Sequence, residues 1–156
     1  MALVLAKLEQ TFQSLRKDWN NNHAIFETTA VKVHSSAAAV QAASSQVHVI
    51  TLQGTAKVID TYETELEVFQ NTVSESVRIT KEIRSLRKQL IDEAQKFDRK
   101  CPAAANTTLL YDLLSMQLAQ IEQEMQIQEL ALSLFSSVSM NLERAETILT
   151  MIRARY

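Results

Sequence analysis

The chain has 156 residues, with 16 Lys and Arg against 18 Asp and Glu, and it contains a single glycine, a single proline and a single cysteine. Average usage would give about 11 glycines and about 8 prolines in a chain of this length. Sandwiches, barrels and doubly wound sheets need tight turns at short intervals, so this composition excludes them and leaves long helices. The formal net charge of −2 provides no overall attraction to nucleic acid or to an anionic membrane surface.

The first predicted element is one long helix over 2–53. Apolar residues recur at alternating spacings of three and four from Leu5 to Ile50, which is the pattern of a heptad helix. Gly54 interrupts this pattern, and glycine is favoured just past a helix C-terminus. The sequence therefore predicts a turn at Gly54, although a glycine inside one continuous helix is an alternative.

A second possible break lies within that first helix. Asn20, Asn21 and Asn22 are three weak helix formers in a row, and such a run suits a turn. The apolar register passes through them unchanged, so a continuous helix is equally compatible. A break here would give the chain four helices.

The next predicted elements are a helix over 55–100, a tip at 101–106 and a helix over 107–155. Pro102 cannot continue a helix, and it disfavours helical angles at the residue before it. The apolar positions of the last helix depart from a strict heptad around Leu132, Phe135 and Val138. We expect this irregular step to change the local supercoil.

Charge predicts how the second and third helices pair. The segment 78–100 has eight basic and four acidic residues, whereas 101–129 has four acidic residues and no basic residue. Folding about the tip sets these segments opposite each other, with Arg84 close to Gln123. The predicted fold is an all-α, elongated antiparallel bundle or coiled coil, forming a single domain over 1–156.

The residues that could carry chemistry are few. His34 and His48 are separated by about 21 Å along one helix, so they cannot share a metal ion. The chain has no Glu-x-x-His pair, no Gly-x-Ser-x-Gly turn and no phosphate-binding glycine loop. We therefore expect no enzymatic activity, no cofactor, no metal and no small-molecule substrate.

The location and the membrane behaviour are also expectations. A lone cysteine, Cys101, cannot form an internal disulfide, which favours an intracellular, cytoplasmic protein. The sequence has no uncharged apolar stretch of the length that spans a bilayer, so no membrane span is expected.

The unusual feature is a long segment with almost no charge. Between Asn20 and Ala56 only Glu27 and Lys32 are charged, and many residues from Ser35 onward are Ala or Ser. The helix of a free-standing bundle normally has a charged solvent face. A second uncharged stretch runs over 130–142. These segments indicate helix faces that pack on a partner chain, and a neutral soluble surface is the alternative.

The resulting hypothesis is a non-enzymatic structural subunit of a larger helical assembly, such as a cytoskeletal scaffold, adaptor or tether. Its partners would be other helical chains in a hetero-oligomer, with no nucleic acid expected. The alternative is a stand-alone bundle that binds a peptide or an acidic surface through the basic helix at 78–90. The predicted partner-binding residues are Trp19, Phe26, Val33, Ala39, Val40, Ala42, Ala43, Val47, Leu134, Phe135, Val138 and Met140.

Overall fold

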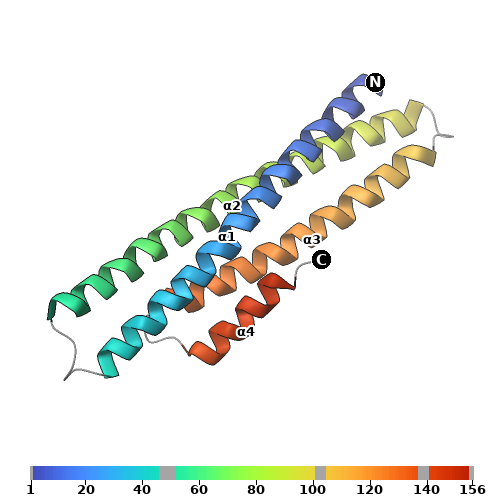
Figure 1. Cartoon of the computed structure of the whole chain (residues 1–156). Coiled ribbons are helices and arrows are strands. Elements are labelled where there is room, and N and C mark those ends of the chain that lie inside the picture. Colours follow the sequence, from blue (N-terminus) through green and yellow to red (C-terminus); the bar gives the residue numbers. More distant parts are fainter. Residues whose placement is uncertain (1, 46–51, 101–104, 137–140, 155–156) are drawn as a thin grey trace. The chain divides into compact units, whose positions relative to one another are not determined.

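The computed structural model describes residues 2–45, 52–100, 105–136 and 141–154 (Figure 1). They form four helices, α1 (Ala2–Ser45), α2 (Leu52–Lys100), α3 (Ala105–Phe135) and α4 (Leu142–Arg153). Within these ranges there is no strand, and only Ser136, Asn141 and Ala154 lie outside a helix. The prediction of an all-α helical bundle is confirmed.

The predicted turn at Gly54 is wrong. Helix α2 already begins at Leu52, so Gly54 lies in its first turn. No described glycine has a positive φ angle, so Gly54 does not adopt the left-handed conformation of a helix C-cap. Glycine in a helix costs only about 1 kcal/mol relative to alanine, so α2 can include it. The connection between α1 and α2, at 46–51, lies outside the described residues.

The possible break at the asparagine run is also absent, because α1 is continuous through it. Asn22 is buried, and its Nδ2 donates a hydrogen bond to the backbone carbonyl of Thr72 at 2.9 Å. This bond to α2 satisfies a side chain that could otherwise compete for the backbone of its own helix.

Contacts between residues divide the chain into two compact units. Unit 1 consists of Met1–Asn21 and Ser76–Met125, and unit 2 consists of Asn22–Glu75 and Gln126–Tyr156. Unit 1 thus contains segments of three helices, whereas unit 2 contains segments of the same three helices together with α4. The single domain over 1–156 stays a prediction.

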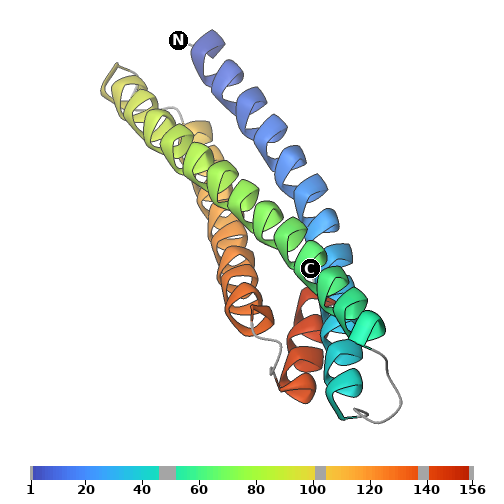
Figure 2. The ribbon, with the colours of Figure 1, turned by 90° about the vertical axis from the view of Figure 1, so that its left-hand side faces the viewer.

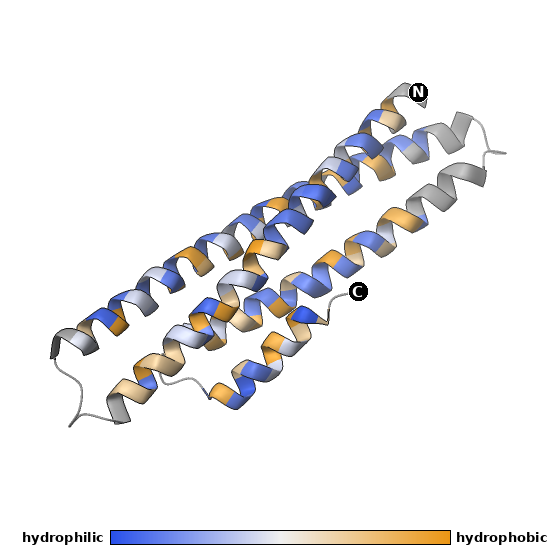
Figure 3. Ribbon diagram, in the orientation of Figure 1, coloured by the Kyte–Doolittle hydropathy of each residue, from blue (hydrophilic) through white to orange (hydrophobic). Residues whose placement is uncertain are grey.

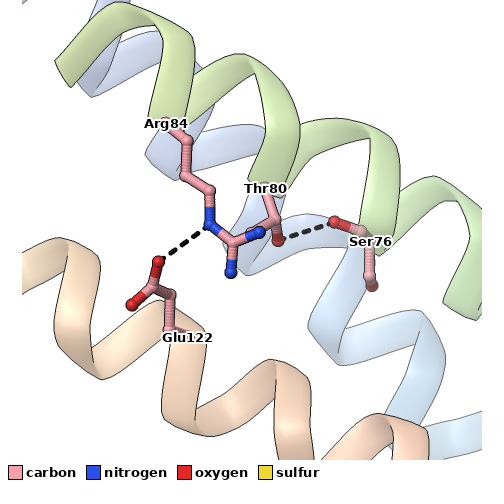
Figure 4. Close-up of polar contacts among 4 residues, drawn as sticks. All are labelled: Ser76, Thr80, Arg84 and Glu122. Carbon is pink, nitrogen blue, oxygen red and sulfur yellow. Dashed lines mark hydrogen bonds and ion pairs between the residues drawn. The ribbon is translucent and has the colours of Figure 1, made fainter. Parts of the chain in front are cut away.

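Unit 1 contains the predicted hairpin of α2 and α3. The Nε of Arg84 donates to the Oε1 of Glu122 at 2.8 Å (Figure 4). This ion pair joins the basic and the acidic segments in the expected register, one residue from the predicted partner Gln123. Apolar residues of both helices form the core beside it: Ile83, Leu86, Leu90, Leu114, Leu118, Ile121 and Met125.

Polar residues also occupy core positions of α2, at the place where its apolar pattern weakens. Ser76 and Thr80 are both buried in unit 1. The hydroxyl of Thr80 donates to the carbonyl oxygen of Ser76 at 2.8 Å, one turn earlier in the same helix (Figure 4). Bonds of this kind satisfy a buried hydroxyl without a partner on another helix, so the register continues unbroken.

Three aromatic rings form the centre of unit 2. Phe69 of α2 lies between Phe26 of α1, with ring centroids 5.2 Å apart, and Phe135 of α3, with centroids 5.7 Å apart. All three side chains are fully buried. Such tilted ring pairs add to the free energy gained by burying the rings. The row therefore joins three helices in one layer.

The predicted single helix over 107–155 is interrupted, because α3 ends at Phe135 and α4 begins at Leu142. Helix α3 ends at Phe135, whose carbonyl oxygen accepts a hydrogen bond from the Tyr62 hydroxyl of α2 at 2.7 Å. The backbone N–H of Ser136 donates to the carbonyl of Leu132 at 3.1 Å, which is the last bond of this helical pattern among the described residues. The irregular spacing of apolar residues thus marks a helix end, which a bond from another helix stabilises.

The interruption creates the fourth helix. In both ribbon views α4 lies beside the segments of α1 and α3 that belong to unit 2 (Figures 1 and 2). It is amphipathic, and its apolar side is buried by four residues: Ala145, Ile148, Leu149 and Ile152. The alternative of four helices therefore gives the number of helices found among the described residues. The additional break, however, lies between α3 and α4 and not at the asparagine run.

Asn141 caps the N-terminus of α4. Its Oδ1 accepts hydrogen bonds from the backbone N–H groups of Glu143 at 3.0 Å and Arg144 at 3.2 Å. We expect Asn141→Ala to lower the free energy of unfolding by about 0.5–2 kcal/mol. Urea denaturation measures the loss, and hydrogen exchange should show it first in α4. Asn141→Asp, which can also cap, should retain most of the stability; an equal loss in both variants would contradict the capping role.

Candidate protein-binding surface

The part of α1 in unit 2 has two clearly different sides. Phe26, Val33 and Val40 point into the core and are buried. The opposite side consists of exposed residues at spacings of three and four, which continue a second heptad pattern around the same helix. We call this side the α1 outer face; it comprises Ile25, Thr28, Lys32, Ser35, Ala39 and Ala42.

The side chains of the α1 outer face are mostly small and almost all uncharged. Lys32 is its single charged residue, and Ile25 is a large apolar side chain that is 54% exposed. In the hydropathy colouring, this part of α1 is mainly white, beige and orange (Figure 3). Short side chains let the backbone of a second helix approach closely. The face therefore has the chemistry of a helix-packing surface, although no other helix of unit 2 covers it.

Six of the predicted partner-binding residues lie in the core of this chain. They are Trp19, Phe26, Val33, Val40, Ala43 and Phe135, all of them buried. Their heptad spacing was identified correctly, but the faces that they form pack on helices of the same chain. A residue with this burial cannot contact a partner unless the bundle opens, so we assign these six to the core.

The other six predicted residues have different positions. Ala39 and Ala42 are exposed on the α1 outer face, and Leu134 of α3 is half-buried. Val47, Val138 and Met140 lie outside the described residues. Both alanines lie on the exposed side of α1, so the two sites are on one face of the helix. Because Ala39 and Ala42 are exposed, packing on another helix of the same chain is not the reason for their small side chains.

Trp19 has a polar contact as well as an apolar environment. Its side chain is 1% exposed, and its Nε1 donates to the Oε2 of Glu124 in α3 at 2.6 Å. Both residues belong to unit 1. An indole N–H that is buried needs such a partner. The contact holds α1 against α3 and gives Trp19 a structural role.

A further polar pair lies in the core of unit 2. His23 is 3% exposed, and its Nδ1 lies 3.2 Å from the Nε2 of Gln128, while its ring contacts Phe26. Gln128 is itself fully buried, at a core position that the sequence pattern of α3 did not include. In the same unit, burial raises the pKa of the Tyr62 hydroxyl above its usual value. These polar groups are therefore part of the buried interior of unit 2.

Three basic residues of α2 form ion pairs with acidic residues of the same chain. Arg78 pairs with Glu82, Lys96 pairs with Glu93 at 3.1 Å, and Arg84 pairs with Glu122. The apolar side of this segment, formed by Ile79, Ile83, Leu86 and Leu90, is buried. The basic helix at 78–90 therefore has no free apolar side for insertion into a lipid surface or a peptide groove in this structure.

The described residues contain neither a cluster of metal ligands nor a helix suited to cross a membrane. No three His, Cys, Asp or Glu side chains among the described residues come together as ligands for a metal ion. None of the four helices, over the described residues, combines the length and the apolar composition needed to cross a bilayer.

A comparison of the chain with family models, curated proteins and solved structures finds no significant match. The fold itself defines the protein as an all-α helical bundle.

The predicted partner-binding residues omit four members of the α1 outer face: Ile25, Thr28, Lys32 and Ser35. A signal for them was available, because positions 25, 28, 32, 35, 39 and 42 repeat at heptad spacing beside the core stripe. The core stripe contains larger apolar residues, so its periodicity is the stronger signal in the sequence. Exposure in the structure separates the two stripes.

Proposed function

We propose that the protein is a non-enzymatic structural subunit that docks on other helical chains through the α1 outer face. The observation that supports this most directly is the exposure of Ile25, Ala39 and Ala42 on a face with one charge. An isolated bundle would be expected to show charged residues there. The partner would be a helix that packs closely on small residues, in a scaffold, adaptor or tether.

Larger side chains on this face test the proposal. Ala39→Leu and Ala42→Leu should leave the melting temperature of the purified chain nearly unchanged, because leucine has almost the helix propensity of alanine and both sites are exposed. In contrast, they should weaken binding of helical partner chains, since overpacking a close contact costs about 1–3 kcal/mol. Affinity purification of the tagged wild type and variants from the native cell measures binding.

Two control variants separate a surface effect from a folding effect. Ala119→Leu changes an exposed alanine of α3 and should alter neither melting nor partner recovery. Ala37→Leu overpacks a fully buried site and should lower the melting temperature. If the two outer-face variants recover the same partners in the same amounts as the wild type, the α1 outer face is only a neutral surface and the proposal fails.

A further inference from the structure

Helix α4 is a short element that depends on its apolar contacts within unit 2. It has 12 residues, and its buried side chains are Ala145, Ile148, Leu149 and Ile152. A helix of this length is marginal in water without tertiary contacts. All of α4 belongs to unit 2, together with the segments of α1 and α3 that lie beside it (Figure 2). The site that α4 occupies therefore stabilises the helix itself.

The sequence between α3 and α4 permits a continuous helix. Residues 136–141 include neither glycine nor proline, which are the strongest helix breakers. The apolar pattern also continues across this segment, from Phe135 through Val138 to Leu142. Local sequence is thus compatible with one helix over 107–155, although the structure shows two.

Side-chain hydrogen bonds stabilise the two ends at this break. The Tyr62 hydroxyl of α2 donates to the terminal carbonyl oxygen of Phe135 at 2.7 Å, and Asn141 caps α4. In a continuous helix the carbonyl of residue 135 would accept from the backbone N–H of residue 139, so the chain would need neither side chain there. One such bond and one cap are small terms, so the broken and the continuous connection differ little in free energy.

We propose that two copies of this chain exchange their α4 helices. In the exchanged dimer α3 continues into α4 as one helix, and each α4 occupies the site beside α1 and α3 of the other copy. The occupant is identical to the helix that the structure shows in this site, so the apolar contacts of α4 are retained. The exchange is reciprocal, and the assembly therefore closes as a two-fold dimer.

The balance between monomer and dimer depends on protein concentration. In the monomer a short connection holds α4 near its own site, which corresponds to an effective concentration in the millimolar range. A second copy competes for the site near that concentration. Each dimer contains two connections, so a change at one connection enters the association constant as its square. The α1 outer face is exposed while α4 occupies its site, so this proposal does not depend on the proposed function.

Sedimentation equilibrium of the full chain, refolded from urea, tests for the dimer. The wild type should contain dimer at about 1 mM and be monomeric at about 1 μM. Tyr62→Phe keeps a buried ring but removes the bond to Phe135, and Asn141→Ala removes the cap of α4. Each variant should raise the association constant at least about fivefold, because the change acts at both connections.

Substitutions at residue 139 test whether α3 continues into α4. Ser139→Pro should prevent dimerisation, because the proline ring would clash with the carbonyl oxygen of residue 135 in a continuous helix. Ser139→Ala is the matched control, and it should dimerise at least as strongly as the wild type because alanine favours a helix. Circular dichroism checks that the variants are helical. Should Ser139→Pro not fold, Ser139→Gly should lower the association constant about threefold or more.

Distance measurements distinguish exchange from other modes of dimerisation. Nitroxide labels are attached through Thr28→Cys on α1 and Glu146→Cys on α4, both exposed sites in unit 2, in a Cys101→Ser chain. The doubly labelled monomer gives the distance between these sites within one copy. In a dimer refolded from the two singly labelled chains, the same distance should appear between copies.

Four results would overturn the proposal. The first is a wild type that stays monomeric at about 1 mM. The second is a lack of any increase in dimerisation for both Tyr62→Phe and Asn141→Ala. The third is a variant with proline or glycine at residue 139 that is helical and dimerises as strongly as Ser139→Ala. The fourth is the absence of the monomer distance between singly labelled chains. Ala39→Leu, which tests the α1 outer face, should leave the exchanged dimer unchanged.

Discussion

Replacing Trp19 by alanine is expected to lower the free energy of unfolding by about 3–5 kcal/mol, because the change truncates a large aromatic side chain in a packed core. Trp19 is 1% exposed, and its indole N–H bonds to Glu124, so the variant loses apolar burial and a hydrogen bond together. Chemical denaturation followed by circular dichroism measures the loss.

Two variants separate the contributions of packing and of the hydrogen bond. Trp19→Phe keeps an aromatic ring but removes the donor to Glu124, and we expect it to lose less stability than Trp19→Ala. Lys17→Ala changes an exposed residue one half-turn away and should be nearly neutral. If Trp19→Ala melts like the wild type, Trp19 is not a core residue and the register of α1 is wrong.

Replacing Phe69 by alanine should have an effect of similar size, about 3–5 kcal/mol. Phe69 lies between Phe26 and Phe135, so its removal breaks two ring contacts and leaves a cavity where α1, α2 and α3 meet in unit 2. Hydrogen exchange of the intact chain should show faster exchange in the segments of unit 2, and denaturation should give the total loss.

The neighbouring residue provides the matched control. Val68 is adjacent in the chain but exposed, so Val68→Ala should change stability by no more than about 0.5 kcal/mol. Phe69→Leu retains apolar volume and should lie between the two. An equal effect of Val68→Ala and Phe69→Ala would show that the aromatic row does not stabilise unit 2 in the way described.

The sequence by itself determined the helical class and most of the core. A near absence of glycine and proline left helices as the remaining fold class, and the heptad pattern of α1 identified buried positions such as Phe12, Trp19 and Phe26. Complementary charge correctly paired Arg84 with the acidic segment of α3. These features are local or depend on spacing along one helix, so they can be read without knowing the neighbours.

Helix ends depended on tertiary contacts. No glycine or proline marks the end of α3 at Phe135; a hydroxyl from α2, Tyr62, bonds the terminal carbonyl there. Gly54 and Asn22 are residue types that often end helices, yet both lie inside helices. Asn22 forms a hydrogen bond to Thr72 of α2. Local propensity differs by only about 1 kcal/mol between such residues and good helix formers, so packing can override it.

Only the tertiary structure could decide which apolar side of a helix remains available to other chains. A heptad stripe in the sequence looks the same whether it packs on its own chain or on a partner. The fold uses Val33 and Val40 for its core and leaves Ile25, Ala39 and Ala42 exposed. The physical reason is that burial depends on which helices surround a side chain, and the spacing of residues along one helix does not contain that information.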